Sequence, residues 1–421
     1  MFAKRITYFW LALFIAGPVC AMADDGHWDD WGGSGKKLIV GQPSTPCPGA
    51  MYTTIGDAVT AAGPGDEIDI CPALYPEQLI ITKPLKLVGI EVNGVNRILI
   101  QPALTDLMGL ATEAVITVMN TQGVVIENLA IDASHNTVAT CSPGLAGVHF
   151  FNASGKVKDS AIFGAQLTNP TGCSKLPVLN GFGVLVDATQ PGPFTVSVEH
   201  NSIHDYTSNG VFANGSAGGV KADIDGNDIS GIGPVSGTFQ FAVYLLNGAV
   251  GHVRHNVLTE GLCGSLTTVA CRAARSEGVT VRNVGDGTVI SDNIISNAQS
   301  GIFINGANDL EVINNRISNI YVLDGIDIQG TAAGHFTNSV IRGNRIFNVG
   351  GISDPNANAS GIIEYYGTGT FSGNEISDNT ISDTAVGVYY VLPDTVTSGT
   401  YFNVLYTTLN EALPSPPNVE P

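Results

Sequence analysis

The sequence predicts an all-β protein wound as a single right-handed parallel β-helix of about ten to twelve coils, and three observations lead to this fold. Only 13% of the 421 residues are charged, and 51 are glycine, whereas globular proteins average roughly 25% charged residues. A repeat of about 30 residues runs through the second half of the chain. A short strand with alternating apolar residues follows each copy. The 44% hydrophobic content excludes disorder.

Residues 1–23 have the features of a signal peptide. Lys4 and Arg5 give a positive start, Ile6–Ala16 is apolar, and Ala21–Ala23 offers small residues at a cleavage site. The apolar stretch is too short to span a bilayer. We therefore expect a secreted or periplasmic protein that inserts into no membrane once the signal is removed.

The residues after the signal predict a leader and then a capped β-helix. Residues 24–37 contain four aspartates and predict a flexible acidic leader. The β-helix domain is expected over 38–410, with a capping helix over 54–62 that begins after Thr54 as N-cap. A cap is needed because the open end of a stack of strands exposes unpaired edges. Residues 411–421 form a Pro-rich tail.

The repeat is aligned on seven asparagines. They are Asn201, Asn227, Asn256, Asn293, Asn315, Asn344 and Asn379. An aliphatic residue stands three positions before each asparagine, and another stands two positions after it. Because so small a unit cannot bury its apolar face alone, the copies must stack in parallel with these aliphatics in internal columns. We expect the asparagines to lie in tight turns with left-handed backbone and to hydrogen-bond up the column.

The outward positions of the second strand carry an unusual number of aromatic residues. Along the stack they are His149, Leu185, Phe212, Tyr244, Thr280, Phe303, Asp327, Ile363 and Tyr389. Aromatic faces suit stacking on sugar rings. The predicted substrate-binding residues are therefore Phe212, Tyr244, Phe303 and Tyr389, together with Arg282. The alternative is that a long loop, notably 259–276, covers this face and buries the rings.

Six cysteines remain after removal of the signal, and an even number in an exported chain predicts disulfides. They fall into three sequential pairs. The predicted disulfides are Cys47–Cys71, Cys141–Cys173 and Cys263–Cys271. A zinc site is disfavoured, because no cysteine pair or histidine has ligand spacing.

The net charge of −19 excludes nucleic acid as a partner, since phosphate binding needs a basic surface. A polyanionic substrate would also be repelled unless its groove is locally basic. All nine lysines lie at or before Lys221, and arginines supply the basic residues further on. We expect a monomer.

The N-terminal part of the predicted β-helix resembles a known group. Thr53–Val59, Gly65–Ile68, Cys71-Pro72, Tyr75–Glu77 and Leu85–Gly89 are similar to the opening of right-handed parallel β-helix proteins of the pectin-lyase-like superfamily. The resemblance implies the activity of a polysaccharide lyase, a glycoside hydrolase, a pectin esterase or a uronate epimerase. The catalytic signatures of those enzymes are missing, so no residue role is carried over.

Candidate catalytic residues lie beside the aromatic row. They are Glu277, Asp324, Asp327 and Arg275. Glu277 and Asp324 occupy equivalent positions two coils apart, which predicts a separation of about 10 Å, near the upper range for an inverting pair of carboxyl groups. Asp324 and Asp327 are also candidate ligands for Ca²⁺, although calcium needs six to eight oxygens. The alternative is a solvated charged edge whose Arg–Glu pairs contribute little.

Two functions are compatible with this sequence. The first is an exported β-helix that binds and cleaves or modifies a polysaccharide on an elongated groove, as a carbohydrate-active enzyme of the polysaccharide lyase or glycoside hydrolase type. The second is a non-catalytic β-helix that binds glycan or serves as a surface structural or adhesion protein. Both have a polysaccharide or oligosaccharide as partner, and neither requires a cofactor other than the candidate Ca²⁺.

Overall fold

Three long parallel sheets build the protein, whose structure is a computed structural model. The structure describes residues 35–43, 47–94, 97–103, 111–138, 141–170, 173–175, 178–234, 238–261, 274–330, 335–350, 359–366, 370–391, 400–402 and 405–408. The predicted signal peptide, the tail over 411–421 and the predicted Cys263–Cys271 disulfide lie outside these residues. Strand β1 begins at Lys37, the last residue of the predicted leader.

Sheet I has 13 strands in the order β1 (Lys37–Val40), β2 (Asp66–Ile70), β5 (Leu85–Gly89), β8 (Val124–Glu127), β11 (Gly155–Lys158), β16 (Phe194–Glu199), β19 (Val220–Asp225), β22 (Val250–Arg254), β25 (Val289–Ser291), β29 (Glu311–Ile313), β33 (Val340–Arg342), β37 (Glu375–Ser377) and β40 (Thr400–Phe402). Sheet II has 11 strands in the order β4 (Leu79–Ile81), β7 (Thr112–Met119), β10 (Gly144–Phe151), β15 (Phe182–Asp187), β18 (Asn209–Asn214), β21 (Phe239–Leu246), β24 (Arg275–Arg282), β27 (Ser300–Asn305), β31 (Ile326–Gly330), β35 (Ser360–Tyr366) and β39 (Val386–Val391).

Sheet III has 12 strands in the order β3 (Ala73–Tyr75), β6 (Ile98–Ile100), β9 (Ala130–Asp132), β12 (Ala161–Phe163), β17 (Ser202–His204), β20 (Asp228–Ser230), β23 (Val257–Thr259), β26 (Ile294–Ala298), β30 (Arg316–Ile320), β34 (Arg345–Val349), β38 (Thr380–Thr384) and β41 (Leu405–Thr408). Two small sheets pair β13 (Ser174–Lys175) with β14 (Val178–Leu179), and β32 (His335–Thr337) with β28 (Ala307–Asn308) and β36 (Thr370–Ser372).

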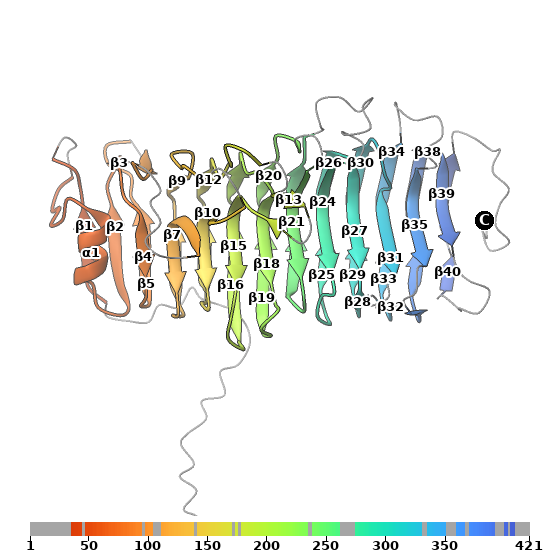
Figure 1. Cartoon of the computed structure of the whole chain (residues 1–421), viewed down its shortest axis with the longest axis horizontal. Helices are drawn as coiled ribbons and strands as arrows, with labels where there is room; N and C mark the ends of the chain where they lie inside the picture. The colour runs from red at the N-terminus through yellow and green to blue at the C-terminus, as the bar shows by residue number, and fades with distance from the viewer. Residues whose placement is uncertain are drawn as a thin grey trace, which may run out of the picture. The chain divides into compact units, whose positions relative to one another are not determined.

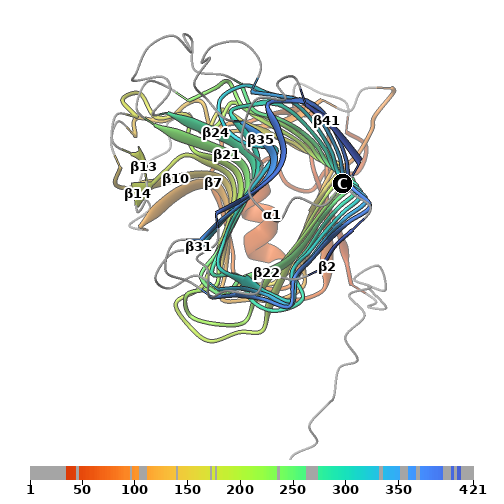
Figure 2. The ribbon, with the colours of Figure 1, turned by 90° about the vertical axis from the view of Figure 1, so that its right-hand side faces the viewer.

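Each coil of the chain adds one strand to each long sheet, and every strand pairs in parallel with its equivalent in the next coil. The coil β16–β17–β18, for example, is followed by β19–β20–β21, with Val198 opposite Ile224 and Ile203 opposite Ile229. Figure 1 shows the equivalent strands side by side, and Figure 2 views the three sheets around a common interior. The predicted parallel β-helix is confirmed.

The interior consists of the aliphatic columns that the repeat predicts. All fourteen residues that flank the asparagines are at most 1% exposed and belong to one apolar cluster. They are Val198, Ile224, Val253, Ile290, Val312, Ile341 and Ile376 on sheet I, and Ile203, Ile229, Leu258, Ile295, Ile317, Ile346 and Ile381 on sheet III. Their removal from water is the main driving force for winding the chain.

The seven asparagines form a hydrogen-bonded ladder along the stack, as expected. In each of the first six, the side-chain Nδ2 donates to Oδ1 of the next asparagine at 2.9–3.0 Å. The backbone N–H of the same residue donates to the same oxygen at 2.9–3.1 Å. Nδ2 also donates to a carbonyl of the preceding coil at 2.8–3.0 Å. The buried amides between the two ends of the ladder therefore use both donors and both acceptor positions.

The prediction that these asparagines themselves have left-handed backbone is wrong. The residue before each asparagine has the positive φ, between 52° and 68°. These residues are His200, Gly226, His255, Asp292, Asn314, Gly343 and Asp378. The preceding residue makes the turn because the asparagine side chain has to point along the stack to reach its neighbours.

One α-helix is found in the described part of the chain, at the N-terminal end of the stack. α1 (Ile55–Ala61) begins after Thr54, whose hydroxyl accepts a hydrogen bond from the Asp57 N–H at 3.2 Å. The Glu77 carboxylate accepts from the N–H groups of Ile55 and Gly56 at 2.8 and 2.7 Å, which satisfies two further free donors of the first turn. The buried face of α1 contacts β1, β2 and β4, and Figure 2 shows the helix within the outline of the coils.

Two of the predicted disulfides, Cys47–Cys71 and Cys141–Cys173, are confirmed. Disulfides are typical of proteins that fold in an oxidising compartment. None of the described helices has the length and apolar character needed to cross a membrane.

We predict that Asn256→Ala lowers the free energy of unfolding by about 2 to 5 kcal/mol, because it leaves two buried donors of Asn227 without an acceptor. Urea denaturation followed by circular dichroism measures the change. Ser202→Ala, at an exposed position of β17, is the control and should change the value by less than about 0.5 kcal/mol. Equal effects of the two substitutions would contradict a stabilising role for the ladder.

Candidate functional site

The outward face of sheet II carries a cluster of aromatic rings. Phe182 and Phe212 stack with their centroids 5.4 Å apart, and Phe212 and Tyr244 lie 5.3 Å apart. Phe241 contacts the same Tyr244 ring at 5.1 Å. These rings lie on three consecutive strands, β15, β18 and β21, so they form a continuous row across the sheet.

An interruption of the strand alternation places two residues of each coil on this face. Phe241 and Tyr244 are three positions apart, yet both point outward. In the next coil Glu277 pairs with Phe241 and Val279 with Val243, and Gly278 falls between them. A Cβ on Gly278 would approach the Ile295 side chain to 2.4 Å, so the chain presses against sheet III at this point. Residues 277 and 280 therefore share the outward face.

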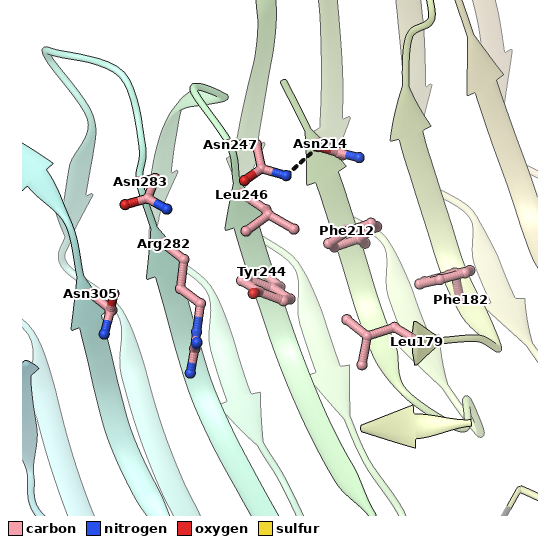
Figure 3. A pocket seen from close by; sticks show the side chains of 10 residues that line it. All are labelled: Leu179, Phe182, Phe212, Asn214, Tyr244, Leu246, Asn247, Arg282, Asn283 and Asn305. Atoms are coloured by element: carbon pink, nitrogen blue, oxygen red, sulfur yellow. Dashed lines mark hydrogen bonds between the residues drawn. The ribbon is translucent and has the colours of Figure 1, made fainter. Parts of the chain in front are cut away.

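A groove with a volume of 510 Å³ runs over this face. It is lined by Leu179, Phe182, Phe212, Asn214, Tyr244, Leu246, Asn247, Arg282, Asn283 and Asn305. Figure 3 shows the aromatic side chains in a row across neighbouring strands, with Asn214 and Asn247 further along the strands of Phe212 and Tyr244. The groove thus has an apolar floor and an edge of amide groups.

Within the part of the chain that the structure describes, two buried polar atoms of this groove lack a hydrogen-bond partner: the Tyr244 hydroxyl and Arg282 Nε. The guanidinium of Arg282 lies over the Phe303 ring, 4.8 Å from its centroid. Burial raises the pKa of Tyr244 well above its ordinary value, although the charge of Arg282 opposes the shift. The hydroxyl therefore keeps its proton and is a hydrogen-bond donor at physiological pH.

Next to the groove, the structure brings together the predicted carboxyl groups. Glu277 pairs with Ser300, whose hydroxyl donates to the backbone oxygen of Asp324 at 3.5 Å. Glu277 and Asp324 therefore lie two strands apart on one face, as expected. Asp327 follows on β31, opposite Phe303. The three side chains are 1%, 8% and 3% exposed, so the alternative of a solvated charged edge is wrong.

Each carboxyl group has a different set of partners. Glu277 is 3.6 Å from a nitrogen of Arg275 and accepts a hydrogen bond from the Thr280 hydroxyl. The N–H of Ser360 donates to Asp324 Oδ1 at 2.6 Å. Asp327 Oδ2 accepts from the Gln329 amide at 2.9 Å, while its buried Oδ1 has no partner. Within this cluster, Asp327 is thus the carboxyl group with an unused oxygen.

Burial dominates the protonation of the cluster. It raises the pKa of Asp324 to about 6. It raises the pKa of Asp327 to about 8, and the negative charges of Asp324 and Glu277 add to the effect. The pKa of Glu277 is also raised by burial, against the opposing charge of Arg275. The raised pKa values bring both groups towards neutrality, and Asp327 keeps its proton to a higher pH than Asp324.

The cluster does not fit the candidate Ca²⁺ site. Among the residues that the structure describes, no three His, Cys, Asp or Glu side chains are placed to share a metal ion. Calcium needs six to eight oxygen ligands.

The predicted substrate-binding residues are distributed unevenly. Phe212, Tyr244 and Arg282 line the groove, and Phe303 lies beneath Arg282. Tyr389 lies on β39, at the far end of sheet II. Tyr244 and Phe303 are at most 1% exposed and Phe212 is 8% exposed, so the rings pack closely against one another and only a small part of their surface lines the groove. Most of loop 259–276 lies outside the described residues.

The asparagines at the edge of the groove are not among the site residues that the sequence predicts. Asn214 and Asn305 stand two positions after the aromatic residues Phe212 and Phe303. Asn247 and Asn283 have positive φ values of 55° and 47° and occupy the turns that follow β21 and β24. An asparagine two or three positions beyond the outward row is the signal that could have found them.

A sequence model described as a right-handed β-helix region matches residues 182–399. Comparison with curated protein sequences gives no match. Among solved structures, a GH136 lacto-N-biosidase from Eubacterium ramulus has a TM-score of 0.50 at 11% identity, covering 89% of this chain and 68% of that one. The Dettilon tailspike protein has a TM-score of 0.48 at 14% identity, with coverage of 86% and 70%. An alginate lyase from Paenibacillus sp. str. FPU-7 has a TM-score of 0.45 at 13% identity, with coverage of 75% and 95%.

We predict that Asp327→Asn flattens the pH dependence of stability. The pKa of Asp327 is raised from 3.8 to about 8 on folding, so the folded protein binds more protons than the unfolded chain between these values. The stabilising contribution is therefore complete below pH 4 and is lost as the pH rises towards about 8. Urea denaturation at a series of pH values should show a shallower decline for the variant. A decline of unchanged slope would contradict a protonated Asp327.

Proposed function

We propose that this chain, which belongs to the right-handed β-helix family, binds a glycan in the groove on the outward face of sheet II. The observation that carries the proposal is the composition of that groove: an aromatic floor, an amide edge and two unpartnered donors in one volume of 510 Å³. Sugars present CH groups on their ring faces and hydroxyl groups around their edges. Aromatic rings complement the CH groups, and asparagine amides can both donate to and accept from hydroxyl groups.

The position of the groove suits an extended ligand. Its lining comes from β14, β15, β18, β21, β24 and β27 or the turns that follow them. Neighbouring strands of a sheet are about 4.8 Å apart, so the five strands of sheet II give a floor about 19 Å long. A ligand lying across the strands would therefore contact equivalent positions of successive coils. The two disulfides fit an exported protein that meets such a ligand outside the cytoplasm.

The lacto-N-biosidase shares this fold, and its own name says that it acts on a glycan. At 11% identity the likeness concerns the fold alone.

We predict that Phe212→Leu weakens glycan binding about 3- to 10-fold, because leucine keeps the apolar volume and removes the ring. Screening a panel of polysaccharides by affinity electrophoresis identifies a ligand, and isothermal titration calorimetry with a fragment of it measures the loss. Phe163→Leu is the matched control, since Phe163 stacks on His204 on sheet III, away from the groove. Equal losses in both variants, or none in Phe212→Leu, would count against the groove.

Cleavage of the bound glycan is a second candidate function, favoured by the carboxyl cluster. A protonated Asp327 beside an ionised Asp324 supplies an acid and a base near neutral pH. Groups with raised pKa values beside a groove are candidates for catalysis. Glu277 and Asp324 are a second candidate pair: two strand spacings separate them by about 10 Å, which is closer to the inverting than to the retaining arrangement.

For this second candidate, we predict that Asp324→Asn lowers product formation at least 100-fold and leaves glycan affinity in the groove within about twofold. Reducing ends and unsaturated ends are both measured, so that hydrolysis and elimination are each detected. A melting temperature near that of the unchanged protein shows that the variant is folded. Full activity of the variant would show that the carboxyl cluster takes no part in the reaction.

A further inference from the structure

We infer that the groove recognises a sparsely acidic glycan, in which one acidic sugar residue contacts Arg282 and Tyr244 and its neutral neighbours lie over Phe212 and Phe182. This inference rests on the proposed function and specifies its ligand class. The acidic group is a carboxylate or a sulfate ester, which share the relevant chemistry: negative charge and several acceptor oxygens.

The Arg282 guanidinium is held in place and has a donor without a partner. One face of it is covered by the Phe303 ring at 4.8 Å, which holds the plane in place. Its buried Nε has no hydrogen-bond partner, and Arg282 forms no ion pair within the described residues. The guanidinium thus lines the groove with one N–H unused, and arginine N–H groups bind carboxylate and sulfate oxygens strongly.

The Tyr244 hydroxyl is the second unpartnered donor of the groove. It belongs to the neighbouring strand, where Leu246 is the register partner of Arg282. Figure 3 shows the hydroxyl on the side of the ring nearer Arg282, and the charge of Arg282 acts on the pKa of Tyr244. The hydroxyl is protonated, buried and unpartnered. Two donors on neighbouring strands that both lack an acceptor carry a cost that an oxygen-rich ligand group removes.

The rest of the groove limits the ligand to few acidic groups. Among the described lining residues, Arg282 is the one charged side chain. Lys86, Lys156 and Lys221 are paired with carboxylates on sheet I, so they do not compensate charge at the groove. The chain carries a net charge of −19. Over Phe182 and Phe212, the described lining residues offer no cation to an acidic group, and the net negative charge of the chain opposes the binding of a polyanion.

The groups around Arg282 leave its guanidinium without an ion pair among the described residues. On the same strand, the charge of Arg282 acts on the carboxyl group of Glu277, but that group is engaged by Arg275 at 3.6 Å and by the Thr280 hydroxyl. The register partners of Arg282 are the uncharged Leu246 on β21 and Asn305 on β27, and its guanidinium lies over Phe303. The acidic sugar residue therefore lies at the β24 end of the groove, and the neutral residues extend towards β15.

The test compares matched forms of one oligosaccharide by isothermal titration calorimetry: a single uronate among neutral residues, the same chain with the carboxyl group reduced to an alcohol, and the same chain with a sulfate ester. We expect at least one acidic form to bind 10- to 100-fold more tightly than the reduced form. A preference for the uronate or for the sulfate ester identifies the source of the charge. A homopolyuronate of equal length should bind more weakly than the singly acidic chain.

Variants assign the effect to the two donors. Arg282→Gln should abolish the preference for the acidic form, Arg282→Lys should retain part of it, and Tyr244→Phe should reduce it 3- to 10-fold. Arg316→Gln, which removes another arginine that lies over an aromatic ring, Phe347 on sheet III, is the matched control and should leave the preference unchanged. Melting temperatures confirm that each variant is folded.

Equal binding of the acidic and reduced forms, or tighter binding of the homopolyuronate, overturns this inference and leaves glycan binding in place. Retention of the full preference in Arg282→Gln also overturns it. If none of these oligosaccharides and no polysaccharide of the panel binds, the proposed function fails and this inference fails with it.

Discussion

The rest of the structure depends on the requirement that each coil bury its apolar face against the next. One coil has only a few aliphatic side chains and cannot form a core alone. Stacking in parallel register aligns those side chains into closed columns, and it also aligns the asparagines so that every amide finds its neighbour at 2.9–3.0 Å. The ladder works in one register only, since a shift by one residue would turn the aliphatic residues outward. The apolar columns drive the stacking, and the amides select its register.

The groove follows from the same constraint. Where sheet III turns into sheet II, glycines such as Gly278 lie so close to the isoleucine column that no side chain fits. This contact interrupts the alternation of the strand and places two residues of each coil on the outer face. The outer face therefore has room for an aromatic row and, a few coils further, for a carboxyl cluster. Arg282 and Arg275 lie where the two meet, each over the Phe303 ring at 4.8 and 5.9 Å.

The carboxyl cluster and the groove differ in their electrostatics because they bury different polar groups. Glu277, Asp324 and Asp327 are close together with Arg275 as their nearby cation, so burial and mutual repulsion hold protons on the cluster. The groove holds uncharged amides and one guanidinium, so its charge is positive and confined to one end. A ligand that crosses the groove towards the cluster would pass from an apolar floor to a cation and then to groups that can exchange protons.

The sequence by itself determined the parallel stack, the fourteen core aliphatics, the capping helix and two of the disulfides, because each depends on spacing along the chain. It also placed Phe212, Tyr244 and Arg282 on one face, since strand periodicity assigns faces. It could not show that Tyr244 and Phe303 are buried, that the residue before each ladder asparagine makes the turn, or that Asn214 and Asn247 join the groove. Those features depend on contacts between residues about 30 positions apart and on the exclusion of water. Only the tertiary structure decides them, because burial, pKa values and unpartnered donors arise from neighbours in other coils.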